Sequence, residues 1–219
     1  MAMKTCTEED LGTEAGRQVM AGCLAAGGVA VFPTETFYGL GGDPRKAEVM
    51  ARIALLKQRQ VAKSFPLVAA GLEDAQDRVD LTAAGEEGLW RLLAGACWPG
   101  PLTLVARARP GLAAGAVAGD GTLAVRIPGH AGARTLASLC GGLLVATSAN
   151  RSGRPPAMSA GEAVAGLAGA IDLLVDGGPV PGGQPSTLVS ITSGRPRLLR
   201  DGAIPRTELE LILGDCPLD

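Results

Sequence analysis

The sequence predicts one α/β domain with a twisted, mixed β-sheet and flanking helices. Segments whose apolar residues recur at helical spacing alternate with short apolar runs, and toward the C-terminus the short runs dominate. No linker rich in proline or serine divides the 219 residues, and a chain of this length can bury one sizeable core. Residues 1–219 are therefore expected to form a single domain.

Helices are expected where apolar residues recur every three to four positions. The segment 44–59 is an example, because Pro44 lies in its first turn and apolar residues recur from Ala47 to Leu56. In the segment 82–96, Thr82 is expected to cap the first turn. The expected helices cover residues 8–26, 44–59, 82–96, 134–140, 159–168 and 205–213.

Strands are expected where short apolar runs are bounded by turn residues, as in residues 28–32, which end at Pro33. Residues 175–186 are rich in glycine and proline and are expected to form a surface loop. The expected strands cover residues 28–32, 66–70, 102–108, 122–127, 143–147, 172–176, 187–191 and 197–200.

The composition argues against several classes of protein. The five cysteines include no CxxC pair and His130 is the only histidine, so neither a disulfide framework nor a zinc site is expected. The formal net charge is −2, whereas proteins that bind nucleic acid through its phosphates need a basic face. The N-terminus lacks an apolar signal core, and no run of about 18 apolar residues spans a membrane. We therefore expect a soluble, cytoplasmic protein with no membrane partner.

The segment 32–42, FPTETFYGLGG, directly follows an expected buried strand, where ligands of α/β sheets tend to bind. Thr34, Glu35 and Thr36 present short polar groups there, and the glycines at positions 39, 41 and 42 are expected to let a ligand approach. The alternative is an ordinary connection from strand to helix. The segment is not a P-loop, because GxxxxGK[ST] is missing.

Two further segments have the composition of anion sites. Lys57 and Arg59 lie two positions apart, so both can face one anion only if the chain is leaving the helix there. The alternative is a solvated basic helix end, which the helix dipole favours. In TSANRSG, Ser148 and Asn150 offer a hydroxyl and an amide after a buried strand, and a capping turn is the alternative.

Two arginines lie in or beside expected strands. Arg126 is flanked by apolar residues in VRIPG, where a lone cation is costly unless it is paired, so an internal carboxylate or a ligand carboxylate is expected beside it. Ser186 precedes one expected strand, and Arg200 ends another fourteen residues later.

Taken in order, seven segments resemble the YrdC-like family of threonylcarbamoyl-AMP synthases, in the form without an extra C-terminal domain. These segments are PTETFYGLG, KQR, WPGPLTLV, VRIPGH, TSANRSG, STLVSI and LLRDGAI, and they span roughly residues 28–204. The resemblance implies a YrdC-like fold whose twisted sheet lines a concave ligand cavity. It also implies a nucleotidyltransferase that turns L-threonine, bicarbonate and ATP with Mg²⁺ into threonylcarbamoyl-AMP and pyrophosphate, for threonylcarbamoyl-adenosine modification of tRNA.

The resemblance assigns roles residue by residue. Lys57 and Arg59 are the expected catalytic residues, because they stabilise charge on the phosphates. The metal is expected to arrive with ATP, without a protein site for it, and transient contacts with tRNA or tRNA-modification proteins are implied. The ATP-binding set is Lys57, Arg59, Ser148, Asn150 and Arg200, and the threonine-binding set is Thr34, Arg126, Thr147 and Ser186.

The chain departs from the family pattern at two positions and loosely matches it at a third segment. Gln60 stands where many relatives have proline, Phe37 stands where many have valine, and residues 63–67 only loosely match the usual polar residue and Pro-Leu. Two rival functions remain. One is carbamoyl transfer, as in the longer hydrogenase-maturation proteins, and the other is a diverged paralogue that binds RNA or nucleotide without catalysis.

Overall fold

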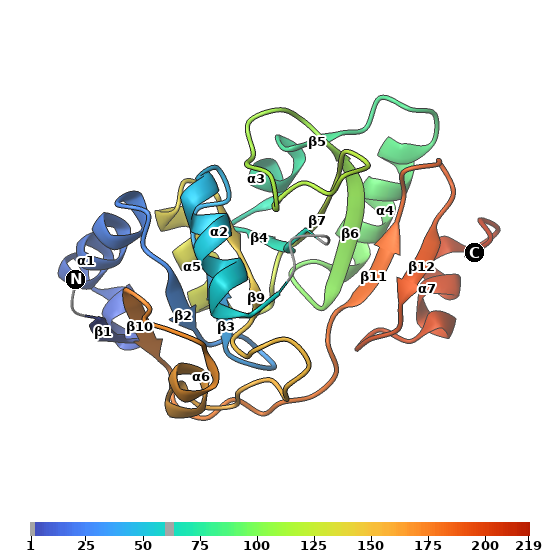
Figure 1. The fold of residues 1–219 in the computed structure, drawn as a ribbon. Coiled ribbons are helices and arrows are strands. Elements are labelled where there is room, and N and C mark those ends of the chain that lie inside the picture. The colour runs from blue at the N-terminus through green and yellow to red at the C-terminus, as the bar shows by residue number, and fades with distance from the viewer. Residues whose placement is uncertain (1–2, 60–63) are drawn as a thin grey trace.

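Two β-sheets lie side by side in the computed structural model, which describes residues 3–59 and 64–219 (Figure 1). The sheet of the N-terminal side has five strands and mixes parallel and antiparallel pairs. Its order is β1 (Lys4–Thr7), β10 (Leu173–Asp176), β2 (Ala30–Phe32), β3 (Gly39–Gly41) and β9 (Thr147–Ser148).

The second sheet has seven strands and reaches toward the C-terminus, on the right of Figure 1. Six of its strands follow the order β12 (Arg197–Arg200), β11 (Thr187–Ser190), β6 (Leu102–Ala108), β7 (Thr122–Arg126), β4 (Leu67–Ala69) and β8 (Leu143–Val145), and β5 (Val79–Asp80) pairs with β6. The chain crosses from β8 in this sheet to β9 in the other with Ala146 alone between them. The mixed, twisted α/β architecture is confirmed.

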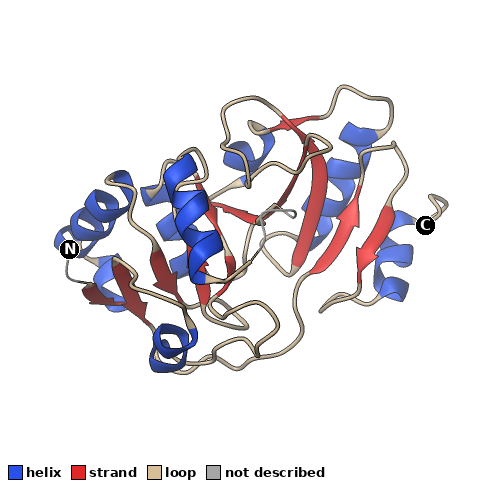
Figure 2. Cartoon of the chain, viewed as in Figure 1, coloured by secondary structure: helices blue, strands red, loops and turns tan. Residues whose placement is uncertain are grey.

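The helices lie around the two sheets, as Figure 2 shows in blue. Helices α4 and α7 contact one another beside the seven-stranded sheet, and α1 contacts α5, which also contacts β4 and β8 of that sheet. The helices are η1 (Glu9–Gly12, a 3₁₀ helix), α1 (Glu14–Ala25), α2 (Ala47–Leu56), α3 (Leu72–Gln76), α4 (Glu86–Cys97), α5 (Ala131–Leu139), α6 (Ala160–Gly166) and α7 (Arg206–Leu213). None of the described helices combines the length and apolarity needed to cross a membrane.

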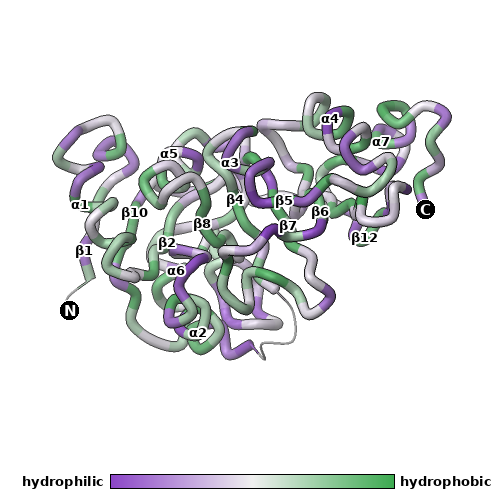
Figure 3. The backbone as a smooth tube through the Cα atoms, turned by 90° about the horizontal axis from the view of Figure 1, so that it is seen from above, coloured by the Kyte–Doolittle hydropathy of each residue, from purple (hydrophilic) through white to green (hydrophobic). Residues whose placement is uncertain are grey.

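Alternation along β2 divides the core into two clusters. Val31 packs with the larger cluster, whereas its neighbours Ala30 and Phe32 pack with the smaller one, because successive strand residues point to opposite faces. The smaller cluster contains apolar residues of α1 and α5, and the larger one joins α2 and α4 to the strands between them. Figure 3 shows hydrophobic stretches at β4 and β8, near the middle of the molecule.

Three helices begin at residues other than those predicted, and side-chain caps explain two of these starts. The expected helix 8–26 is divided at Thr13, whose side chain accepts a hydrogen bond from Gly16 N and caps α1. Thr82 does not cap α4, which starts after Gly85 in a left-handed conformation (φ 84°). Helix α5 begins three residues before the expected start at residue 134, because His130 Nδ1 accepts a hydrogen bond from Ala133 N.

Gly39 and Gly41 of FPTETFYGLGG lie in strand β3 instead of an open turn, and Gly42 directly follows that strand. A Cβ atom at Gly41 would lie 1.7 Å from the Val145 carbonyl oxygen, and one at Gly42 would lie 2.6 Å from the Val49 side chain. These two glycines therefore let the chain pack against itself. The expectation that they admit a ligand is wrong for both, whereas Gly39 does border the cavity described next.

Candidate functional site

A cavity of about 970 Å³ opens where the two sheets meet. Its wall includes β3 and β9 of the five-stranded sheet and residues from five strands of the other. All nine residues singled out from the sequence border it: Thr34, Lys57, Arg59, Arg126, Thr147, Ser148, Asn150, Ser186 and Arg200. The structure thus brings together residues that are spread over more than 160 positions of the sequence, although their individual roles remain predictions.

Lys57 lies directly after the last turn of α2 and is only 3% exposed. Its Nζ donates hydrogen bonds to the backbone carbonyls of Ser148 and Asn150, the latter at 2.9 Å. Burial, with a smaller contribution from the Arg59 charge, lowers the pKa of Lys57 to about 8. Lys57 therefore ties the end of α2 to the loop after β9, and it is a cation without a carboxylate partner among the described residues.

Arg59 lies beyond the end of α2, where the chain is no longer helical. Lys57 and Arg59 can therefore face the same anion, although they are two positions apart. Its guanidinium carbon lies 5.0 Å from the centre of the Phe65 ring, within the range of a cation–π contact. Burial lowers the pKa of Arg59. The departures from the family pattern at Gln60 and Lys63 lie outside the described residues.

The Asn150 side chain forms hydrogen bonds within the loop that follows β9. It is 8% exposed, and its Nδ2 donates to the carbonyls of Arg151 and Arg154. The expected alternative of a capping turn is thus partly right, because the side chain organises its own loop, but Ser159 is the residue that caps α6. Asn150 Oδ1 has no hydrogen-bond partner among the described residues, and Asn150 borders the cavity.

The two threonines predicted to bind substrate lie on neighbouring segments of the cavity wall. The Thr34 hydroxyl donates to the Phe37 carbonyl at 2.7 Å and accepts from the backbone N–H groups of Thr36 and Phe37, each at 3.3 Å. It fixes the turn between β2 and β3. Thr147 is buried in β9 and pairs with Leu40 of β3.

Arg126, the last residue of β7, finds an internal carboxylate. Its Nη1 donates to Glu35 Oε1, and both side chains are largely shielded from solvent. The internal carboxylate that was one of the two expected partners is therefore present, and Arg126 also borders the cavity. Glu35 comes from the turn after β2, so the ion pair joins the two sheets.

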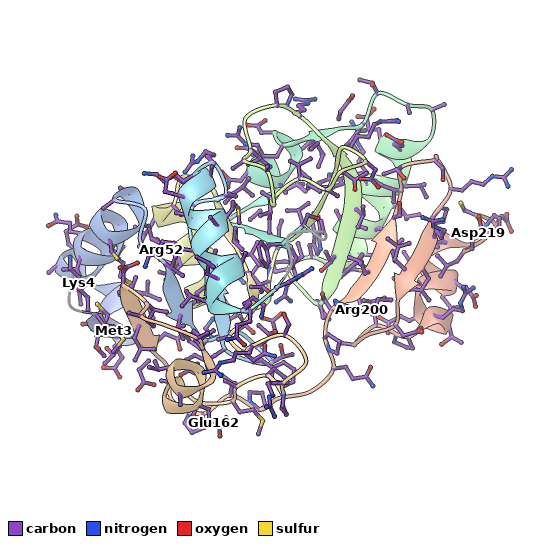
Figure 4. The ribbon with its side chains drawn as sticks, in the orientation of Figure 1. Met3, Lys4, Arg52, Glu162, Arg200 and Asp219 are labelled. Atoms are coloured by element: carbon purple, nitrogen blue, oxygen red, sulfur yellow. The ribbon has the colours of Figure 1, made fainter. Side chains whose placement is uncertain are left out.

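Arg200 ends β12 on the side toward the middle of the molecule, as Figure 4 shows. Its Nη2 donates to the Ser186 carbonyl at 2.6 Å and to Ser186 Oγ at 3.2 Å. Ser186 Oγ also lies 2.7 Å from the hydroxyl of Thr103 in β6. The sequence prediction missed Thr103, although a lone polar residue between Leu102 and Leu104 is a signal that could have found it.

The charge of the cavity has one sign. It contains Lys57, Arg59, Arg126 and Arg200, and among the described residues that line it none is acidic. Partial burial and the nearby Arg126 lower the pKa of Arg200, as expected for neighbouring cations. No group of metal-ligating side chains gathers within residues 3–59 and 64–219. Such a cavity suits an anionic ligand, despite the net charge of −2 of the whole chain.

Comparison with known proteins identifies relatives of this chain. The family model Sua5/YciO/YrdC, described as "Telomere recombination", matches residues 22–202. A threonylcarbamoyl-AMP synthase of Xanthomonas campestris is 38% identical over 81% of this chain and 93% of its own length. One of Chromohalobacter salexigens is 40% identical over 78% of this chain and 90% of its own. The solved structure of Pyrococcus abyssi Sua5 complexed with L-threonine superposes with a TM-score of 0.85 at 31% identity, covering 100% of this chain and 63% of that protein.

Proposed function

The chain belongs to the Sua5/YciO/YrdC family, and we propose that it is a threonylcarbamoyl-AMP synthase. The proposed reaction joins L-threonine, bicarbonate and ATP to give threonylcarbamoyl-AMP and pyrophosphate, which makes the enzyme a nucleotidyltransferase. The observation that carries the proposal is the cavity itself. Its four cations and its lack of a described acidic lining residue suit the carboxylate, carbonate and phosphates of these substrates.

The proposed reaction depends on the alignment of the substrates and on nearby positive charge, and it does not need a nucleophilic side chain of the enzyme. Bicarbonate takes up a proton and gives carbon dioxide and water. The neutral amine of threonine adds to the carbon dioxide and loses a proton to form a carbamate, a carbamate oxygen attacks the α-phosphorus of ATP, and pyrophosphate leaves. No covalent intermediate with the enzyme is required, so catalysis rests on alignment and on cations placed where negative charge develops. Lys57, Arg59 and Arg200 are the proposed charge stabilisers.

The cations of the cavity are assigned to different parts of the proposed substrates. Lys57 and Arg59 lie at the end of α2, beside the loop that holds Ser148 and Asn150, and we assign them to the phosphates and the carbamate. Arg126 lies with Thr34, Thr147 and Ser186 in the proposed threonine site. Arg200 contacts Ser186 and is near Arg126, so it is the cation that bridges threonine and nucleotide.

Magnesium belongs to the nucleotide in this proposal. The described lining residues include hydroxyls, an amide and cations but no carboxylate, and Mg²⁺ is usually held by one or two carboxylates together with substrate phosphates and water. The residues present therefore fit a metal that enters on ATP, and they do not fit a resident metal. The product would pass to proteins that modify tRNA in the cytoplasm, a setting consistent with the five free cysteines.

Pyrophosphate release by the purified protein tests the proposal. We expect release with ATP, Mg²⁺, bicarbonate and L-threonine, and loss of release when threonine is omitted or replaced by serine. Release that requires carbamoyl phosphate instead of threonine would favour the rival carbamoyl-transfer reaction. If ATP binds but no combination releases pyrophosphate, the synthase proposal fails and the RNA- or nucleotide-binding alternative takes its place.

A further inference from the structure

We propose that Glu35 is a positioning residue for the amino-acid substrate. It lies behind Arg126 and holds the guanidinium in the orientation that receives the threonine carboxylate. The inference rests on the proposed function, because it concerns how that substrate is bound. In this proposal Glu35 acts on the threonine site through Arg126, and its own side chain does not touch the substrate.

Arg126 joins the cavity wall to a carboxylate that is not part of that wall. Arg126 borders the cavity, whereas Glu35 is not one of the described residues that line it. The carboxylate accepts from Nη1 of Arg126 and leaves its other N–H groups without a described partner. A guanidinium has five N–H donors in a fixed plane, so one anchored nitrogen defines how that plane faces the cavity.

The remaining N–H groups match a carboxylate. Arginine binds carboxylates through two parallel hydrogen bonds, which requires a defined orientation of the guanidinium plane. With Glu35 on one side, the plane is already oriented before the ligand arrives. Substrate-binding groups work best when a second layer of contacts locks their rotamers, and Glu35 supplies that layer for Arg126.

The charge balance gives Glu35 a second effect on Arg126. Arg200 is close enough to Arg126 for the two charges to repel each other. The carboxylate of Glu35 contacts Arg126, so its negative charge offsets this repulsion. Without that charge, Arg126 would be free to turn away from Arg200, and the incoming carboxylate would have to order it again.

A competing interpretation makes the opposite prediction. If Glu35 were an inhibitory occupant of the site that threonine must displace from Arg126, removing its charge would tighten threonine binding. If Glu35 orients Arg126, removing its charge weakens threonine binding. The direction of the change in KM therefore separates the two interpretations.

The test is steady-state pyrophosphate release by Glu35→Gln, varying threonine and ATP separately. We expect the KM for threonine to rise about tenfold, in line with the loss of a charged hydrogen bond, while the KM for ATP stays within about twofold, since Glu35 contacts no phosphate-binding residue. Glu35→Asp keeps the charge on a shorter side chain and should recover part of the loss. An unchanged or lower KM for threonine in Glu35→Gln overturns the proposal.

Glu86→Gln is the matched control. Glu86 is also a shielded carboxylate that pairs with an arginine, Arg107, at 2.8 Å, and like Glu35 it has one buried oxygen without a described partner. Neither residue of that pair borders the cavity. Glu86→Gln should therefore change stability without changing the KM for threonine. If both variants change this KM equally, the effect is general destabilisation and the proposal for Glu35 falls.

The outcomes distinguish this inference from the proposed function. A wild-type protein without threonine-dependent pyrophosphate release removes both. A wild-type protein with release, compared with a Glu35→Gln variant of equal KM and equal melting temperature, removes the role of Glu35 alone. A double variant adds the last check, because Glu35→Gln should have little further effect on threonine binding once Arg126→Gln has removed the group it positions.

Discussion

Lys57 is a charged side chain in an almost fully buried position, and its neighbours decide what it can do. Two carbonyls, those of Ser148 and Asn150, accept hydrogen bonds from its ammonium group. An ammonium has three N–H donors, so one remains for a ligand in the cavity that Lys57 borders. The same contacts orient the loop that carries Ser148 and Asn150, so Lys57 combines a binding role with a structural one.

The charge of Lys57 predicts a pH dependence of ATP binding. Because its pKa is lowered to about 8, the free protein loses this positive charge as the pH rises above that value. We expect the dissociation constant for ATP, measured by calorimetry between about pH 7.5 and 9.5, to increase roughly tenfold per pH unit above about 8. Lys57→Arg should weaken ATP binding at pH 7.5 but show a flatter profile, because arginine stays charged. A wild-type profile as flat as that of Lys57→Arg would contradict the assignment.

The effect of this lysine on stability has the opposite sign. Its usual pKa is 10.5 and the folded value is about 8, so between these values the unfolded chain binds the proton that the folded chain has released. The contribution of Lys57 to the free energy of unfolding therefore increases as the pH rises from about 8 to 10.5. Loss of ATP binding above pH 8 is thus not expected to reflect unfolding at Lys57.

At the scale of elements, the connection from β10 to β11 is the segment that links the two sheets across the cavity. We call residues 177–186 the strap; it runs along the lower edge of Figure 2. The Tyr38 hydroxyl donates to the Gly178 carbonyl at 2.7 Å, and Gly182 N donates to the Thr36 carbonyl at 2.9 Å. Ser186 at its end borders the cavity, so these contacts help to place a proposed substrate residue.

Removing the Tyr38 hydroxyl should loosen the strap. Tyr38→Phe deletes the donor to Gly178 and the acceptor of the Gly177 N–H at 3.1 Å, at a cost of roughly 1–2 kcal/mol in the free energy of unfolding. We expect faster hydrogen–deuterium exchange in residues 177–183, while exchange in β6 stays as in the wild type. Equal protection of the strap in both proteins would show that Tyr38 does not hold it.

The elements also show what the sequence could predict. The bounds of β6 and β12 agree with the prediction, because their apolar runs are bounded by turn residues on both sides. Strand β3 was missed because it consists of Gly39, Leu40 and Gly41, and glycine disfavours strands unless close packing requires it. That requirement comes from Val145, more than 100 residues away, so no local pattern reveals it.

In the candidate site, too, the sequence predicts some features and not others. Its nine residues could be found from short motifs, since their types and order resemble a known family, and all nine border one cavity. The side chains that contact these residues could not be found in this way. The arrangement of the two sheets brings Glu35 to Arg126, and the pairing of β6 with β11 brings Thr103 to Ser186.

At the scale of the whole molecule, the cavity is built from both sheets, so a ligand in it contacts both parts of the fold. The chain also crosses between the sheets at Ala146, whose N–H donates to the Pro66 carbonyl at 2.9 Å, and Val145 N donates to the Gly42 carbonyl at 3.0 Å. These backbone contacts lie beside the proposed phosphate and threonine residues. A bound nucleotide should therefore stabilise the two sheets together.

ATP with Mg²⁺ is expected to raise the stability of the entire fold in one step. At a ligand concentration of 100 times Kd, binding adds about 2.7 kcal/mol to the free energy of unfolding, which for a chain of this size corresponds to a rise in Tm of roughly 5–10 °C. Differential scanning calorimetry should show one transition that moves as a whole, because ligand contacts reach both sheets. Lys57→Ala should lose most of the shift through the missing cavity cation, whereas Arg91→Ala, which removes an exposed arginine paired with Glu87 outside the cavity, should keep it. A wild-type transition that splits in two, with one component unmoved by ATP, would mean that one sheet unfolds independently of the site.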